Sequence, residues 1–147
     1  MGGTRGGRSK TGRLPALWVG LALLVVTIPA DSATAYEILV SLSADRSGAV
    51  SLEGESVAGD VFVFTSPDTG VSEVRFWVDD PSRSGSADKV ERNAPFDLAG
   101  TNRDDTAIPF DTTSLGDGSH SVTAELVLDD GSVVVVDSTF TVANSAP

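Results

Sequence analysis

The chain has 147 residues, a formal net charge of −11 and no cysteine. Disulfide bonds and a cysteine-linked lipid anchor are therefore excluded, so burial of apolar side chains must hold any folded domain together. The acidic balance also disfavours nucleic acid and anionic membrane surfaces as partners, because both are bound through basic footprints.

The first 35 residues have the pattern of a secretory signal peptide. Residues 1–13 carry four Lys or Arg and no acid, residues 14–28 are largely apolar, and residues 33–35 read Ala-Thr-Ala. The apolar run is shorter than the ~20 residues of a membrane-spanning helix. The sequence predicts cleavage after Ala35 and export, to the cell surface or beyond it. An uncleaved membrane anchor is the alternative.

The mature chain would begin at Tyr36 and would be more acidic than the precursor. Removing residues 1–35 leaves 147 − 35 = 112 residues with 6 Lys+Arg and 20 Asp+Glu, a formal charge of 6 − 20 = −14. This length suits one domain. Its acidity favours solubility and the attraction of cations, and we expect no membrane association after cleavage.

The first half of the mature chain alternates apolar and polar residues with the period of β-strands. Strands are predicted over residues 37–43, 57–65 and 72–78, with a short edge piece at residues 50–52. A turn sequence at residues 66–70, Ser-Pro-Asp-Thr-Gly, separates the second and third of these strands.

Residues 79–107 form the irregular part of the sequence. Pro81 has no main-chain donor and Gly85 has no side chain to pack, so a central strand cannot continue here. The segment is long for a connection in a compact domain. Short edge strands are therefore expected within it, near residues 89–92 and near Phe96.

The clearest strands are the last two, at residues 120–128 and 133–142. Residues 129–132 read Asp-Asp-Gly-Ser and predict a hairpin turn with Asp130-Gly131 as its central pair. About seven strands over residues 36–143 predict an all-β, antiparallel β-sandwich. Residues 144–147 are predicted to begin a linker.

Three segments give the chain a resemblance to the bacterial Ig-like domains of secreted and cell-surface proteins. They are Val57–Phe64, Gly70–Asp79 and Phe110–Ala124. The resemblance implies an immunoglobulin-like sandwich that acts as a spacer or accessory module, with neighbouring domains, an extracellular protein or a glycan as partner. Residues 80–107 depart from the family, in which this connection is shorter.

A structural corner is expected at Asp111, Asp117, Gly118 and His120. In Ig-like sandwiches a ring at the start of a late strand often bonds back to the preceding corner. His120 has this position after the sequence Gly-Asp-Gly at residues 116–118, where the glycines permit a tight reversal.

Catalysis has little support in the sequence, and no catalytic residues are assigned. The chain has one histidine, and the neighbouring Ser119 and Ser121 point to the opposite face of a strand from His120. A paired-carboxylate glycosidase needs a cleft, for which a sandwich of this size offers little room. No metal ligands are assigned either.

A calcium ion is a weaker alternative, suggested by the aspartates at turns and strand ends. Local turn formation and solvation explain the same residues and are the favoured interpretation, and no D-x-D-x-D-G loop is present. The aspartates concerned are Asp79, Asp80, Asp104, Asp105, Asp111, Asp117, Asp129 and Asp130.

Aromatic residues supply the alternative function, carbohydrate binding. By strand parity Phe62, Phe64 and Trp77 point away from the core, and exposed rings on a sheet stack on sugars or dock another domain. Trp77 and the 79–107 loop would then form the binding surface. The competing interpretation is that this loop folds back over Trp77, with Phe96 as its own anchor. The main hypothesis is a secreted, non-catalytic structural or interaction module.

Overall fold

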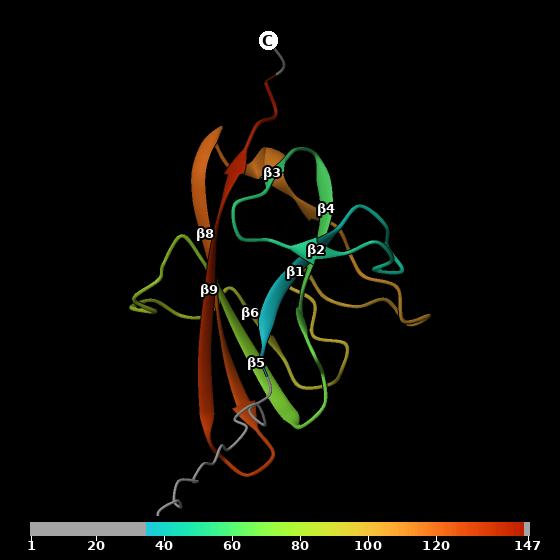
Figure 1. Cartoon of the computed structure of the whole chain (residues 1–147), viewed down its shortest axis with the longest axis vertical. Coiled ribbons are helices and arrows are strands. Elements are labelled where there is room, and N and C mark those ends of the chain that lie inside the picture. The colour runs from blue at the N-terminus through green and yellow to red at the C-terminus, as the bar shows by residue number, and fades with distance from the viewer. Residues whose placement is uncertain (1–34, 146–147) are drawn as a thin grey trace, which may run out of the picture. The chain divides into compact units, whose positions relative to one another are not determined.

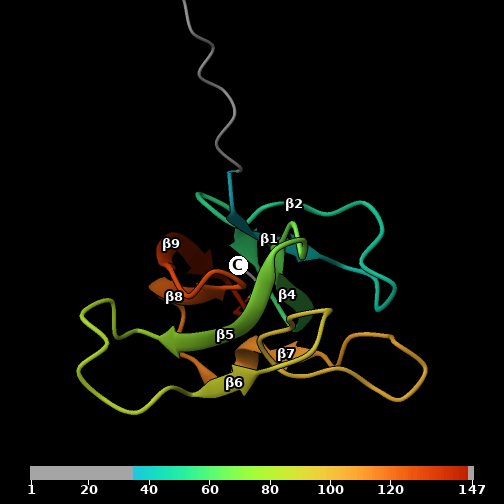
Figure 2. The same cartoon turned by 90° about the horizontal axis from the view of Figure 1, so that it is seen from below.

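The computed structural model describes residues 35–145, which form two β-sheets packed face to face (Figures 1 and 2). The signal peptide predicted for residues 1–35 lies outside the described residues except for Ala35. One sheet contains β1 (Glu37–Ser41), β2 (Val50–Ser51), β4 (Asp60–Ser66) and β7 (Phe110–Asp111). The other contains β3 (Ser56–Val57), β5 (Val71–Val78), β6 (Lys89–Glu91), β8 (Gly118–Leu128) and β9 (Val133–Val142). The predicted all-β sandwich is confirmed.

The strand order is β2-β1-β4-β7 in the first sheet and β3-β9-β8-β5-β6 in the second. Strands far apart in the sequence are neighbours in the sheets: β4 lies beside β7, and β5 lies beside β8. A short 3₁₀ helix, Thr112–Ser114, follows β7. In sequence this helix connects β7 of the first sheet to β8 of the second.

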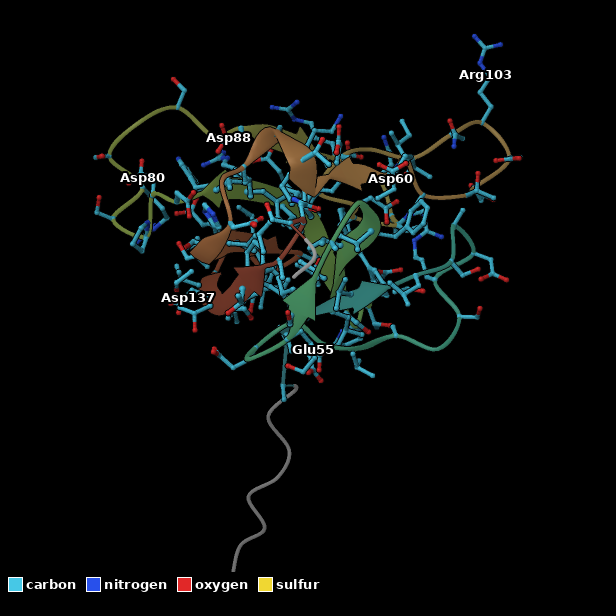
Figure 3. The ribbon with its side chains drawn as sticks, turned by 90° about the horizontal axis from the view of Figure 1, so that it is seen from above. Glu55, Asp60, Asp80, Asp88, Arg103 and Asp137 are labelled. Atoms are coloured by element: carbon cyan, nitrogen blue, oxygen red, sulfur yellow. The ribbon has the colours of Figure 1, made fainter. Side chains whose placement is uncertain are left out.

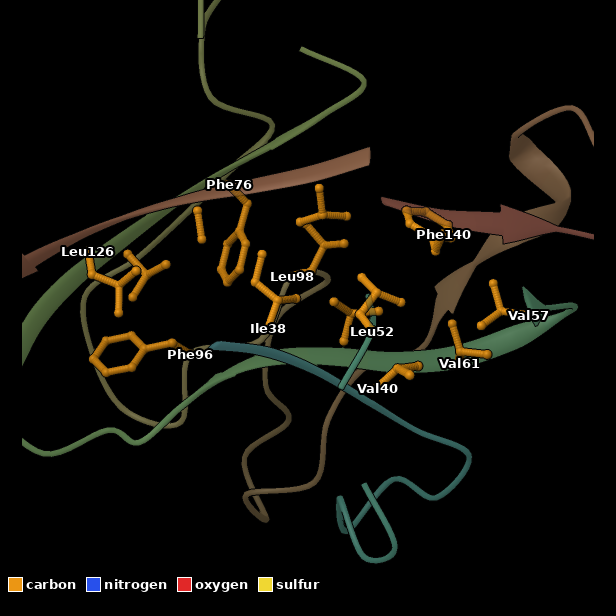
Figure 4. Packing of buried hydrophobic residues seen from close by; sticks show 14 of the residues in the cluster. Ile38, Val40, Leu52, Val57, Val61, Phe76, Phe96, Leu98, Leu126 and Phe140 are labelled. Atoms are coloured by element: carbon orange, nitrogen blue, oxygen red, sulfur yellow. The ribbon is translucent and has the colours of Figure 1, made fainter. Parts of the chain in front are cut away.

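The core fills the space between the two sheets with aliphatic and aromatic side chains (Figure 4). Both sheets supply it through alternate residues, and Phe76, Val122 and Leu126 have no exposed surface. Three further core residues come from the connections rather than from strands: Leu52, Phe96 and Leu98. Deleting a buried ring such as Phe76 costs about 3–5 kcal/mol of folding free energy.

The strand predicted over residues 57–65 is two strands in different sheets. Ser56 and Val57 pair with Thr141 and Val142 of β9, whereas β4 begins at Asp60 and pairs with β1. Between them Gly59 has a φ of +65°, a left-handed conformation that reverses the chain's direction. The β3–β9 pair is parallel, whereas all other pairs between the named strands are antiparallel.

The β8–β9 hairpin lies where it is predicted, but its turn is built differently. The amide of Gly131 donates to the carbonyl of Leu128 at 2.9 Å, which makes Asp129 and Asp130 the central pair. Gly131, with a φ of +87°, follows as a bulge residue. A turn followed by a left-handed Gly keeps the right-handed twist of the two strands, as the Asp-Gly turn would also have done.

The long segment at residues 79–107 is anchored at several points. Residues 89–91 form β6 on the edge of β5, and Asp97 forms a bridge with Phe64 of β4. Phe96 is 1% exposed and packs in the core, as expected of an anchor. The two edge pieces predicted near residues 89–92 and near Phe96 are therefore both present, the second as a bridge only.

Candidate functional site

Trp77 faces away from the core, but the loop after β5 covers it. Trp77 is 7% exposed, and its Nε1 donates to the carbonyl oxygen of Gly85 at 2.8 Å. The loop is shaped by Asp80, whose carboxylate accepts the amides of Gly85 at 2.8 Å and Ser84 at 3.1 Å. These bonds lower the pKa of Asp80 to about 2. Of the two interpretations of Trp77, the structure agrees with the one in which the 79–107 loop folds back over the ring, and not with an open ring.

Phe62 and Phe64 lie in the other sheet from Trp77, so the three rings form no common platform. Phe64 is 8% exposed, and the guanidinium of Arg46 lies over its ring at 6.0 Å from the centroid. Phe62 is partly exposed. The open sugar-stacking surface expected from strand parity is not formed by these residues, because connections from elsewhere in the chain cover two of them.

A bidentate ion pair joins Arg46, in the connection between β1 and β2, to Asp97, in the connection between β6 and β7. Arg46 Nε and Nη2 donate to the two carboxylate oxygens at 2.8 and 2.5 Å, and Thr101 Oγ1 donates at 2.5 Å. Asp97 is 1% exposed and Arg46 15%, measured on their side chains. The hydrogen bond to Asp97 raises the pKa of Arg46 further above its ordinary value. Sequence reasoning missed this pair, because 51 residues separate its members.

A chain of ion pairs crosses the outer face of the second sheet. Glu73 pairs with Arg92 and Arg75, and Arg75 also contacts Glu125 at 3.1 Å. Arg83 of the loop closes the chain on Glu125 at 2.5 Å. Glu73 and Glu125 are only 14% and 15% exposed, so this network covers the sheet beside Trp77. The sequence predicts the strand over residues 72–78, but not the ion-pair partners of its outward-facing side chains.

His120 connects β8 to two other segments. Its Nε2 lies 2.6 Å from the carbonyl oxygen of Gly116, in the corner before the strand, and its Nδ1 lies 2.7 Å from Asp79 Oδ2. Both partners accept hydrogen bonds, so both ring nitrogens must carry a proton for the two bonds to form together. Hydrogen bonds to Asp79 and Gly116 accordingly raise the pKa of His120.

The other corner residues cap turns and hold the last residues of the fold. Asp111 accepts the amide of Thr113 at 2.9 Å and caps the 3₁₀ helix. Asp117 accepts the amides of Asn144 and Ser145 at 2.8 and 3.0 Å, and Gly118 has a φ of +127°. The folded part of the chain thus includes Asn144 and Ser145, where the sequence analysis placed the start of a linker.

The turn aspartates bind their own neighbours rather than one another. A Ser or Thr two residues further along donates its hydroxyl and its amide to the carboxylate, which lowers the carboxyl pKa. This arrangement occurs at Asp104, Asp111 and Asp130. Within residues 35–145, no group of three or more His, Asp and Glu side chains is arranged to hold a metal ion.

A small pocket lies beside the β1–β2 edge. It encloses about 240 Å³, and its lining includes Val40, Leu42, Val50, Glu55 and Val57. Leu42 is 82% exposed and Val50 49% exposed at its rim. It contains one carboxylate and no nucleophile–base pair, so it resembles a shallow apolar contact surface more than a reaction site.

Searches against known proteins return distant structural likenesses only. No family model matches the chain, and no curated protein matches it. An endo-β-1,4-mannanase from Thermotoga petrophila aligns with a TM-score of 0.45 and 15% identity over 78% of this chain, which spans 21% of the mannanase. Fibronectin(III)-like modules of CbhA from Clostridium thermocellum align with a TM-score of 0.38 and 14% identity, covering 63% of this chain and 88% of theirs. CopC from Methylosinus trichosporium OB3b gives a TM-score of 0.36 and 18% identity, with coverages of 65% and 88%.

In the part of the chain that the structure describes, no helix has the length and apolar character needed to cross a membrane.

Proposed function

We propose that the chain is a secreted, non-catalytic interaction module of the bacterial Ig-like type, a spacer or accessory domain of an extracellular or cell-surface protein. The strand order and the three segments at residues 57–64, 70–79 and 110–124 support the family. The pattern of residues 1–35 supports export.

One observation carries the non-catalytic part of the proposal. His120 is the only histidine of the chain, and both its ring nitrogens are occupied by Asp79 and Gly116. A general base needs a free nitrogen within reach of a substrate proton. His120 instead joins three segments of the fold, which is a structural role.

A hydrolase panel on residues 36–147 tests this proposal, with His120→Gln as the matched variant. We expect no turnover of ester, glycoside or peptide substrates above the level of the variant. An activity that the wild type has and His120→Gln lacks would overturn the proposal. N-terminal sequencing of the chain released by a bacterial host tests export, and a first residue other than Tyr36 would contradict the predicted cleavage.

The burial of Trp77 removes the observation that favoured carbohydrate binding, so that function is not proposed.

A further inference from the structure

Strand β9 has a free edge at its first half. At its other end β3 pairs with Thr141 and Val142, and the main-chain groups of Thr139 are bonded by Glu53 and Gly54. Alternate residues of a strand direct their N–H and C=O groups to the same edge. The main-chain N–H and C=O groups of Val133, Val135 and Asp137 therefore point to the same edge as those of Thr139. Within residues 35–145 none of these groups of the three residues has a hydrogen-bond partner on that side.

This edge lacks the usual protection against strand pairing. Exposed edges are commonly blocked by Lys, Pro or a bulge. Residues 133–137 read Val-Val-Val-Val-Asp, and their register with β8 runs without a shift. Val133 is 53% exposed and Val135 42% exposed. An exposed, β-branched edge of this kind can pair with another strand, and it spans about 13 Å.

The charge around the edge is negative at both ends. Asp129 and Asp130 lie in the hairpin turn at one end, and Asp137 and Glu53 lie at the other; within the described residues none of the four has an ion-pair partner. From Asp104 to Pro147 the chain carries eight acids and no Lys or Arg. In the view of Figure 3, Asp137 projects from the opposite side of the molecule to Arg103.

The cations that lie near this face are already engaged. Arg75 and Arg83 both contact Glu125, which is the cross-strand partner of Val135. A second copy of this acidic chain would bring two Asp137 carboxylates and two acidic turns together at the same edge, which charge repulsion opposes. The occupant that complements the edge is therefore a basic segment.

We propose that the β9 edge from Val133 to Asp137 binds an extended basic segment of a partner polypeptide by strand addition. The proposal rests on the interaction-module function and names its surface. Main-chain hydrogen bonds to Val133, Val135 and Asp137 supply the pairing. Alternate side chains of the partner pack beside the two exposed valines, while its Lys or Arg residues face the aspartates at either end.

A peptide titration tests the proposal directly. The described residues, 35–145, form a compact unit of their own, so residues 36–147 are used with a fluorescein-labelled probe of sequence Lys-Val-Lys-Val-Thr-Val-Lys, acetylated and amidated. We expect saturable binding by fluorescence anisotropy that weakens with added salt. Amide hydrogen exchange should slow at Val133, Val135 and Asp137 when the probe binds. A probe with Glu in place of each Lys is the charge control and should not bind.

Two matched variants separate the edge from the rest of the surface. Val135→Pro removes the central outward N–H, and proline is tolerated at such an edge position, so the fold should persist with a similar melting temperature. Its affinity for the probe should fall by at least about tenfold, since one hydrogen bond is lost and the ring obstructs the partner strand. Val135→Thr keeps the N–H and the branched shape and should bind within about threefold of the wild type.

Four results would overturn the proposal. These are no binding of the basic probe, equal binding of the acidic probe, undiminished binding by a folded Val135→Pro domain, and a dimer in sedimentation that Val135→Pro abolishes, which would make a second copy the occupant. None of them touches the hydrolase panel, so failure of the edge and failure of the non-catalytic function are distinguishable.

Discussion

The buried ion pair of Arg46 and Asp97 gives the sharpest test of what holds the β1–β2 connection to the long segment at residues 79–107. Arg46→Ala removes two hydrogen bonds to Asp97 and one from Nη1 to the carbonyl of Asp105 at 2.9 Å. The Asp97 side chain, 1% exposed, would keep only the hydroxyl of Thr101 as a partner. Alanine is preferable to glycine here, because Arg46 has a φ of +64° and glycine would relax the backbone as well.

The expected cost of Arg46→Ala is about 3–5 kcal/mol, the range for an uncompensated buried charge. For a domain of this size the loss corresponds to a fall in melting temperature of roughly 10–20 °C. Arg46→Lys keeps the charge but not the two-pronged geometry and should cost about 2 kcal/mol. The double variant Arg46→Ala/Asp97→Ala should show a coupling energy of at least about 2 kcal/mol.

Urea unfolding measures these changes, with fluorescence of Trp77, the only tryptophan of residues 36–147. Arg103→Ala is the matched control, because this exposed arginine projects into solvent (Figure 3) and has no ion pair among the described residues. Its free energy of unfolding should stay within about 0.5 kcal/mol of the wild type. An Arg46→Ala variant that unfolds within about 1 kcal/mol of the wild type would refute the reasoning.

Three further predictions concern the corner at His120, the covered ring of Trp77 and the change from one sheet to the other at Gly59. The pKa of His120 is raised in the fold by Asp79, so its contribution to stability is complete below about pH 6.5 and is lost as the pH rises through the folded-state value. Between about pH 6 and about pH 9 the urea midpoint of the wild type should fall relative to that of His120→Gln. The same pH dependence of the midpoint in both proteins would contradict this. Acrylamide should quench Trp77 several-fold less in the native domain than in urea; equal quenching would mean that the ring is open. Gly59→Ala should cost about 1–2 kcal/mol because of its left-handed φ, whereas Gly116→Ala, with no such φ and no close neighbours, should be nearly neutral in the same urea assay.

Local alternation made part of this fold predictable. Along β8, Val122, Ala124 and Leu126 face the core as their spacing required, and the return strand β9 follows the turn after Leu128. These features depend on residues two apart, which a pleated strand places on the same face whatever surrounds it. The position of His120 beside the preceding corner, four residues away, is local in the same sense.

The division of the predicted strand at Gly59 is a feature that local sequence does not predict. Residues 57–65 alternate well enough for one strand, and nothing in their order says that Val57 joins one sheet and Val61 the other. The switch depends on contacts with the far end of the chain, such as the hydrogen bond from the Gly59 amide to Asn144 at 2.7 Å. A partner 85 residues distant leaves no periodic signal near Gly59.

By itself the sequence determined the class of the fold, the absence of cysteine chemistry, the acidic character and which residues alternate between faces. Only the tertiary structure decided which outward faces are closed and which stay open: Trp77 is covered by the loop that follows it, while Val133 and Val135 remain free. The physical reason is that parity tells which side of a sheet a residue occupies, whereas coverage depends on where distant segments pack, and packing is a property of the whole chain.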